Sequence, residues 1–283
     1  MTTVIKKKII HKTVSYSFLC LIGIVMVYPL FWLISASFKT NNEIFSSISL
    51  LPKEILWNGY RDGWKGSGQY SFSLFFGNTF RLVVPTVLFT IISSLLVAYG
   101  FSRFKFKGKK IMFSLVIASL MLPNEVIIIP RYMVFNKLGW LNTYLPFIVP
   151  AAFATYSFFI FMLVQYIRSI PRELDESATI DGCGSFGILT RIITPLCVPS
   201  LISVLIFQFV WRWNDFLNAL IYISSVRKYP LSLALRMSLD VTDTIVWNQT
   251  LAMSVLSMLP PVILFFLTQK YFVEGVATTG LKG

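Results

Sequence analysis

The stretch LGWLNTYLPFIVPAAFATYSFFIFMLVQYI, residues 138 to 167, contains 30 consecutive residues without Asp, Glu, Lys or Arg. A helix needs about 20 mostly apolar residues to cross the hydrocarbon core of a bilayer. An amphipathic helix of a soluble protein would instead carry polar or charged residues along one face. The stretch therefore predicts a helix that spans a membrane. It also indicates that the whole chain folds as a membrane protein.

Similar stretches recur along the chain. Of the 283 residues, 55% are hydrophobic and 13% are charged, against about 25% charged residues in an ordinary soluble domain. We predict an all-α integral membrane protein with six transmembrane helices, because five more apolar stretches follow the same rule: 13–38, 82–102, 111–130 (interrupted only by Glu125), 192–211 and 244–269. The first of these could be a signal peptide, but it is longer than the apolar region of about 7 to 15 residues in such peptides.

Basic residues in the loops predict which side of the membrane each loop occupies. With both termini in the cytoplasm, 14 Lys and Arg lie in the inner segments 1–13, 102–110, 168–191 and the tail after 269. The outer segments 39–75, 131–142 and 223–249 hold 9 over a greater length, so the positive-inside rule favours this orientation. We expect a multi-pass protein of the cytoplasmic membrane. The net charge of +13 then reflects topology and contact with anionic membrane lipid, and no nucleic acid is expected as a partner.

These boundaries give the expected domain organisation. Residues 1–38 form the cytoplasmic N-terminus and first transmembrane helix, and 39–75 form an extracytoplasmic loop. Residues 76–270 form the transmembrane core, with a cytoplasmic elbow at 169–194, and 271–283 form a cytoplasmic tail. The outer segments hold 9 basic but only 5 acidic residues, a surplus that could attract an acidic binding protein or oligosaccharide. Long loops that simply escape the charge rule are the alternative.

The residues that usually carry enzyme chemistry are scarce. The chain has one histidine, His11, and three scattered cysteines, without a CxxC pair or a G-x-x-x-x-G-K-[ST] motif. We therefore expect no catalytic residues, no metal site and no cofactor bound by this chain. If the protein drives an energetically unfavourable process, the energy must come from a partner or from an ion gradient.

Three ionisable residues lie inside or at the ends of apolar stretches, where their cost suggests a function. Glu125 lies between Pro123 and Pro130, which are expected to break the helix. Arg212 and Asp215, with Asn214 between them, lie on one helical face and can pair. Each of these residues could line a translocation path. The alternatives are an interfacial position for Glu125 and a purely structural pair for the other two.

The stretch ELDESATIDGCGSFGILTRIITPL, Glu173 to Leu196, predicts a helix–glycine–helix elbow. Ser169 is expected to cap the first helix, with Pro171 in its first turn and acidic side chains near its positive end. Gly182 is expected to end it in a left-handed conformation. Ser185 should cap a second helix whose inner side carries Phe186, Leu189 and Ile193, and Pro195 and Pro199 should open the next membrane helix. An acidic loop that docks no partner would share these features, so they alone do not establish a docking role.

The spacing within the elbow resembles the cytoplasmic loop of binding-protein-dependent ABC importer permeases. That family has Glu-Ala-Ala, three residues, Gly, nine residues, Ile, one residue, then Leu-Pro. The matching positions here are Glu176, Ser177, Ala178, Gly182, Ile192 and Pro195, with Ser177 replacing the first Ala and Thr194 the Leu. Further stretches, among them AYGFSRFKFKGKK and FQFVWRWNDFLNALIY, are similar to the carbohydrate branch and to its smaller maltose-type inner-membrane subunit.

The resemblance implies a type I importer transmembrane domain that works by alternating access. It implies a second homologous permease, two ATPase subunits that bind ATP and Mg²⁺, an extracytoplasmic solute-binding protein and a sugar as cargo. The elbow would be the coupling helix on which an ATPase docks, through Glu176, Ser177, Ala178, Asp181, Gly182, Ile192 and Pro195. Alternatives are a permease for another delivered solute, an ATP-independent secondary carrier, or a lipid-modifying membrane enzyme. The carrier should show a repeat between its halves and the enzyme polar clusters at the interface, and neither is evident in the sequence.

Overall fold

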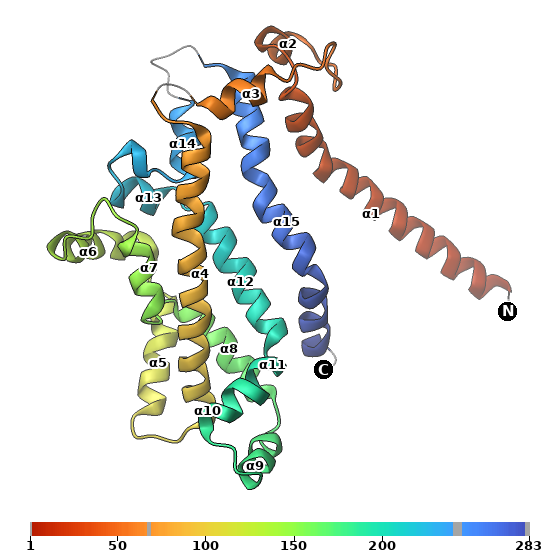
Figure 1. The fold of residues 1–283 in the computed structure, drawn as a ribbon. Coiled ribbons are helices and arrows are strands. Elements are labelled where there is room, and N and C mark those ends of the chain that lie inside the picture. Colours follow the sequence, from red (N-terminus) through yellow and green to blue (C-terminus); the bar gives the residue numbers. More distant parts are fainter. Residues whose placement is uncertain (1, 67–68, 240–244, 281–283) are drawn as a thin grey trace. The chain divides into compact units, whose positions relative to one another are not determined.

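The computed structural model describes residues 2–66, 69–239 and 245–280, with the backbone alone for 2–11 and 271–280. These residues form helices joined by loops, and no strand occurs among them (Figure 1). The chain divides into two compact units. The first is Met1–Phe72 with Leu235–Met258, and the second is Ser73–Ala234 with Leu259–Gly283. Residues 281–283 of the expected tail, and 240–244 of the expected last outer loop, lie outside the described residues.

The predicted all-helical membrane fold is confirmed. Four helical segments are long and apolar enough to cross a bilayer: Lys12–Ala36, Phe72–Arg103, Leu145–Ser169 and Trp247–Lys270. Two bent helix pairs bring the total to as many as six: Lys109–Leu120 with Asn124–Lys137, at 106°, and Ser185–Leu196 with Val198–Trp213, at 75°. These six segments match the six apolar stretches of the sequence.

The third predicted span is broken, and one of the two breaks expected at its prolines is confirmed. Helix α5, Lys109–Leu120, ends three residues before α6, Asn124–Lys137, and the two differ in direction by 106°. The break falls at Pro123, which has extended backbone angles and lacks the N–H group that a continuing helix would use. Pro130 was expected to break the helix too, but it lies inside α6. A single missing donor there is tolerated by the hydrogen bonds on either side.

In the first unit, the segment 39–72 is partly helical. The unit contains α1 (Thr2–Ala36), α2 (Asn41–Ser46), α3 (Asn58–Lys65) and the first part of α15 (Trp247–Gly280). Phe38 packs against the rings of Trp57 and Tyr60, with centroid distances of 5.0 and 5.2 Å. A Cβ on Gly59 would lie 2.8 Å from the carbonyl oxygen of Asn248, so α3 approaches α15 as closely as a glycine allows.

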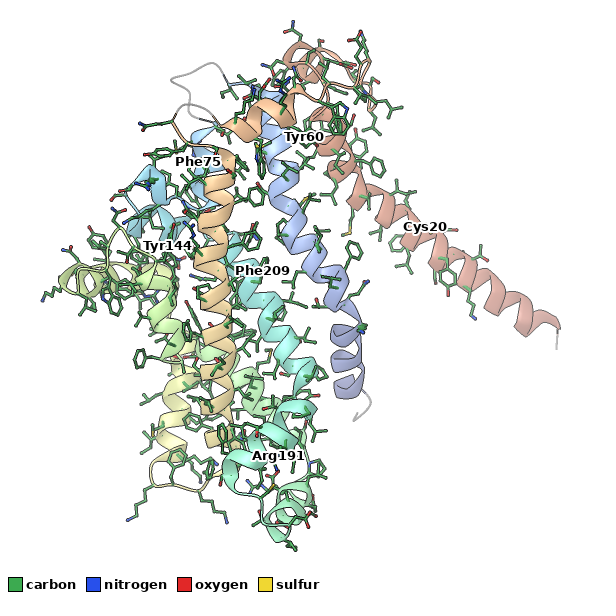
Figure 2. All side chains as sticks on the ribbon, viewed as in Figure 1. Cys20, Tyr60, Phe75, Tyr144, Arg191 and Phe209 are labelled. Carbon is green, nitrogen blue, oxygen red and sulfur yellow. The ribbon has the colours of Figure 1, made fainter. Side chains whose placement is uncertain are left out.

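The second unit is built around α4, Phe72–Arg103. It contains α5 and α6, α7 (Leu145–Ala152), α8 (Ser157–Ser169), α12 (Val198–Trp213) and α13 (Leu217–Tyr222). Its core joins α4, α8 and α12 with the segment before α12, through buried side chains that include Ala98, Leu163, Ile193 and Val204 (Figure 2). Burying such aliphatic side chains against one another stabilises the unit and fixes the C-terminal end of α4 beside residues 170–197.

Candidate functional site

The predicted elbow is present in the structure, as a short helix and a second helical segment. Helix α9 spans Glu173–Ile180. The second segment consists of α10 (Ser185–Ile188), a π-helical turn (Leu189–Ile193) and α11 (Thr194–Leu196). Helix α12 follows after a 75° bend, with Pro199 in its first turn as predicted. Pro195 instead lies in the first turn of α11, one step earlier than expected.

Gly182 adopts the left-handed conformation that the sequence predicts, with φ of +81°. The amide of Gly182 donates to the carbonyl of Thr179 at 3.0 Å, and the amide of Cys183 donates to that of Ala178 at 2.9 Å. This pair of bonds is the Schellman arrangement that satisfies the last carbonyls of a helix. A Cβ on Gly182 would meet no atom within 4 Å, so in this chain the glycine is required by backbone conformation alone.

Three local details of the elbow differ from the prediction. Ser169 is the last residue of α8, and its hydroxyl donates to the carbonyl of Tyr166. Ile170 is held extended before Pro171, which lies outside α9, so α9 begins only at Glu173 without a side-chain cap. Ser185 is the first residue of α10, where Gly184 holds the cap position.

The inward-facing side of the second segment also differs. Leu189 and Ile193 are buried as expected, but Phe186 is 73% exposed and Ile188 takes its place in the core. The reason is the π-helical turn, in which the amide of Thr194 bonds the carbonyl of Leu189, five residues back. This wider turn changes which side chains share a face.

The elbow therefore has a buried side and an open side. Of the predicted coupling residues, Ala178 is buried and Ile192 is half-buried against the core. The others are exposed: Glu176, Ser177, Asp181, Gly182 and Pro195. Two large apolar side chains accompany them, with Ile180 exposed by 87% and Phe186 by 73%. The open surface thus combines carboxylates, a glycine turn and apolar groups.

The C-terminal end of α4 holds the elbow in place. Nε of Arg103 lies 2.6 Å from Oδ2 of Asp175, and both side chains are largely buried. The guanidinium of Arg103 also donates to the carbonyl of Ile170 at 3.1 Å. One turn earlier, the hydroxyl of Tyr99 donates to the carbonyl of Ser185 at 3.0 Å. These contacts link the last turn of α4 to both helical parts of the elbow, and no signal within the elbow sequence could have identified them.

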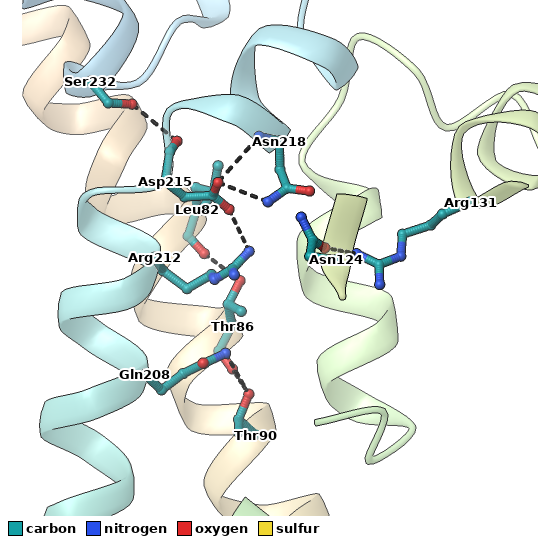
Figure 3. A network of polar contacts seen from close by, with 10 residues as sticks. All are labelled: Leu82, Thr86, Thr90, Asn124, Arg131, Gln208, Arg212, Asp215, Asn218 and Ser232. Atoms are coloured by element: carbon teal, nitrogen blue, oxygen red, sulfur yellow. Dashed lines mark hydrogen bonds and ion pairs between the residues drawn. The ribbon is translucent and has the colours of Figure 1, made fainter. Parts of the chain in front are cut away.

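A second polar cluster lies where α12 ends (Figure 3). Arg212 and Asp215 form the ion pair that the sequence predicts, with 2.6 Å between Nη1 and Oδ2. Oδ1 of Asp215 accepts hydrogen bonds from the backbone and side-chain amides of Asn218, and thereby caps α13. The hydroxyl of Ser232 donates to the carbonyl of Asp215 at 3.2 Å. The pair therefore has a structural role at the break between α12 and α13.

The remaining path candidates lie apart from this cluster or at its edge. Asn214 is exposed, and its side-chain amide donates to the carbonyl of Val210. Glu125 is exposed in the first turn of α6, where a carboxylate is favoured by the helix dipole. Deeper along α12, the buried amide of Gln208 donates to the hydroxyl of Thr90 on α4 at 3.0 Å. Whether Glu125, Arg212, Asn214 and Asp215 line a path stays a prediction.

Known proteins resemble this chain over nearly its whole length. Residues 90–278 match the family described as binding-protein-dependent transport system inner membrane component. The chain is 35% identical to the probable ABC transporter permease protein YurM of Bacillus subtilis (strain 168), over 98% of this chain and 91% of that protein. It is 31% identical to the trehalose/maltose transport system permease protein MalG of Thermococcus litoralis, over 93% of this chain and 94% of that protein.

A solved structure shares the fold. It is the crystal structure of a bacterial ABC transporter involved in the import of the acidic polysaccharide alginate. One of its chains aligns with a TM-score of 0.82 at 22% identity, over 93% of this chain and 96% of that chain.

Proposed function

Because this chain belongs to the family of binding-protein-dependent transport system inner membrane components, we propose that it is the permease subunit of an ATP-driven sugar importer. The resemblance drawn from the elbow residues is confirmed at the level of the family. The cargo is a sugar or oligosaccharide, a proposal supported by the trehalose/maltose relative. The protein crosses the membrane several times, and we place both termini in the cytoplasm because of the basic residues in its inner segments.

The open side of the elbow carries this proposal. Ile180 and Phe186 are exposed beside the carboxylates of Glu176 and Asp181. A free connector would gain nothing from holding two large apolar side chains in water, whereas burying each against a partner is worth about 1.5–3 kcal/mol. The surface is therefore suited to a protein that docks from the cytoplasm, and an ATPase subunit is the partner that the family uses. ATP and Mg²⁺ bind to that ATPase.

Transport follows from movement of this docked elbow. Two ATPases would hold the elbows of this chain and of a second, homologous permease, and closure of the ATPase dimer on ATP would draw the elbows together. The Arg103–Asp175 and Tyr99–Ser185 contacts pass the displacement into α4. An extracytoplasmic binding protein would then deliver its sugar to the outward-open state. ATP must bind the two states with different affinity for this cycle to run, since equal binding shifts no equilibrium.

A single cysteine on the open side tests both the topology and the docking. The variant Ser177→Cys, with the native cysteines replaced by Ser, introduces a small exposed thiol on the elbow. A membrane-impermeant maleimide should label it in inside-out vesicles but not in right-side-out cells, and bound ATPases should slow the labelling. Lys107→Cys is the matched control, because it lies in the exposed loop after α4 and should label from the same side without protection.

Two results would refute the proposal. Labelling of Ser177→Cys from outside would overturn the orientation, and equal labelling rates with and without ATPases in an assembled complex would overturn the docking. Purification gives an independent check, because a second permease and an ATPase should co-purify with the chain. A chain that transports alone and without ATP would be a secondary carrier instead.

A further inference from the structure

A polar pocket of about 440 Å³ lies at the end of α4 opposite the elbow. Its polar lining comes from three segments of the second unit: Asn78 and Arg81 of α4, Thr143 and Tyr144 before α7, and Arg227 and Lys228 of the 3-10 turn η2 (Val226–Lys228). The volume falls within the range of small-molecule sites, about 300–1,000 Å³. The pocket is separate from the elbow and from the Arg212–Asp215 cluster.

The backbone around the pocket is fixed from two sides. On α4, the buried side-chain amide of Asn78 donates to the carbonyls of Arg227 and Tyr229 at 2.9 and 3.0 Å. From the other side, the hydroxyl of Tyr144 donates to the carbonyl of Lys228 at 3.0 Å. Asn142, with a left-handed φ of 56°, exchanges two hydrogen bonds with Ser225. The pocket is therefore a built feature of the fold.

Among the described residues, no acidic side chain forms an ion pair with the cations of the pocket. It contains two guanidinium groups and one ammonium group, and none of its lining residues is acidic. Within residues 2–66, 69–239 and 245–280, the ion pairs join other residues: Lys65–Asp62, Arg103–Asp175 and Arg212–Asp215. The ammonium of Lys228 donates to the carbonyl of Asn142 at 2.7 Å, which leaves its charge in place. Burial raises the pKa of Tyr144, and the charge of Arg81 opposes that rise.

The pocket lies at the level of the membrane surface. Arg81 and Arg103 are 22 residues apart on the continuous helix α4, which at about 1.5 Å per residue separates them by about 33 Å. That distance is close to the thickness of the hydrocarbon core, about 30 Å. With Arg103 at the cytoplasmic side, Arg81 and the pocket therefore open at the outer surface, where delivered cargo enters.

We propose that this pocket is an outer subsite for an anionic sugar, one that carries a carboxylate or a phosphate ester. The proposal rests on the proposed function and names its substrate class. Guanidinium groups bind both kinds of anion through paired hydrogen bonds. The hydroxyls of Thr143 and Tyr144 already donate to backbone carbonyls, so what they offer to sugar hydroxyls is the acceptor capacity of their oxygens. A concave site of this size fits a sugar ring. A docking contact for an acidic protein surface would need no such hollow.

Binding of D-galacturonate, compared with D-galactose, tests the proposal directly. The two sugars differ by one carboxylate. Each is titrated, without ATP, onto the purified full-length chain in phosphatidylcholine nanodiscs. Partner subunits are included where they co-purify. We expect galacturonate to bind more tightly and with stronger salt dependence. Arg81→Gln and Arg227→Gln should each weaken it by about tenfold, because hydrogen bonds to charged groups are the stronger class. Arg61→Gln is the matched control, an exposed outer arginine outside the pocket, and should have no effect.

The other outcomes overturn either the pocket proposal or the proposed function, and the two cases can be distinguished. Equal binding of galacturonate and galactose would show that the pocket does not recognise the anion. An equal loss of galacturonate binding in Arg61→Gln would show that the pocket arginines have no specific role. Loss of galacturonate binding on adding phosphatidylglycerol would assign the pocket to lipid headgroups. Weaker docking of the binding protein in Arg81→Gln, whatever its cargo, would assign it to that protein. A complex that binds galacturonate without ATP-dependent transport would count against the proposed function alone, and an ATP-driven transporter without such binding would count against the pocket alone.

Discussion

Replacing Arg103 by Met should uncouple the elbow from α4. Nε of Arg103 lies 2.6 Å from Oδ2 of Asp175, and the two side chains are only 7% and 17% exposed. The other carboxylate oxygen of Asp175 is buried and has no hydrogen-bond partner within the described part of the chain. The variant therefore leaves a carboxylate with little water and no counter-charge, while Met keeps most of the apolar stem of Arg103.

The expected magnitude follows from this burial. Removing one partner of a fully buried ion pair costs about 3–5 kcal/mol, and an exposed pair is worth at most about 1 kcal/mol. The side chain of Asp175 is 17% exposed and keeps some contact with water, so we expect about 1–3 kcal/mol. That free energy lowers the population of correctly placed elbow by about 5- to 150-fold relative to displaced forms.

The assay is the amount of sugar transported per ATP hydrolysed in proteoliposomes that contain the complete importer. Arg103→Met should lower this ratio while the ATPases stay bound, because the open side of the elbow is unchanged. A cycle with Asp175→Asn should give an interaction free energy of about 1–3 kcal/mol, and the double variant should be less impaired than the sum of the single ones. Lys105→Met, an exposed residue of the adjoining loop, is the control. Normal coupling in Arg103→Met, or an interaction term below about 0.5 kcal/mol, would refute the reasoning.

Substitutions at three further positions have defined outcomes. Gly182→Ala should cost about 1 kcal/mol through its left-handed φ of +81° and keep the ATPases bound, whereas Gly182→Asp should also obstruct docking and abolish transport; normal transport by the Asp variant would exclude the docking role. Arg212→Leu should destabilise the subunit by about 3 kcal/mol in a melting experiment, with partial rescue by adding Asp215→Asn, since it strands a carboxylate side chain that is 8% exposed. Gly59→Ala should lower the melting temperature, because its Cβ would lie 2.8 Å from a carbonyl oxygen of α15; Gly77→Ala, with no atom within 4 Å, should not.

Features encoded over a few consecutive residues were predictable from this sequence. Apolar length identified the six membrane segments, and a glycine after an acidic helix identified the left-handed end at Gly182. A change of direction within a segment was harder to predict from the sequence. The stretch 111–130 is apolar throughout, apart from Glu125, and its pattern does not distinguish a straight helix from one bent by 106° at Pro123. Pro123 was the local signal, and the break expected there is present, but the sequence did not predict its angle.

Features that depend on contacts between distant residues were not predictable. Arg103 and Asp175 are 72 positions apart in the sequence, and neither is unusual in its own segment. The face occupied by Phe186 depends on a π-helical turn, for which the residues Leu189–Ile193 carry no evident signal. The same holds for the basic pocket, whose cations come from two segments that only the fold brings together.

The contacts of α4 explain how a docked elbow could affect the outer surface. At its C-terminal end, Tyr99 and Arg103 hold the elbow. At its N-terminal end, Asn78 holds two carbonyls of the 227–229 turn, and the hydroxyl of Thr79 accepts from the amide of Leu231 at 2.8 Å. The 32 residues of α4 form one helix without a break, about 48 Å long at 1.5 Å per residue. Pro85 lies inside α4 without interrupting the helix. Because one helix holds the contacts at both ends, the elbow and the cationic turn at the pocket should move together. ATP-driven movement at the elbow would then change the geometry of the pocket, and an anionic cargo would be held in one state and released in the other.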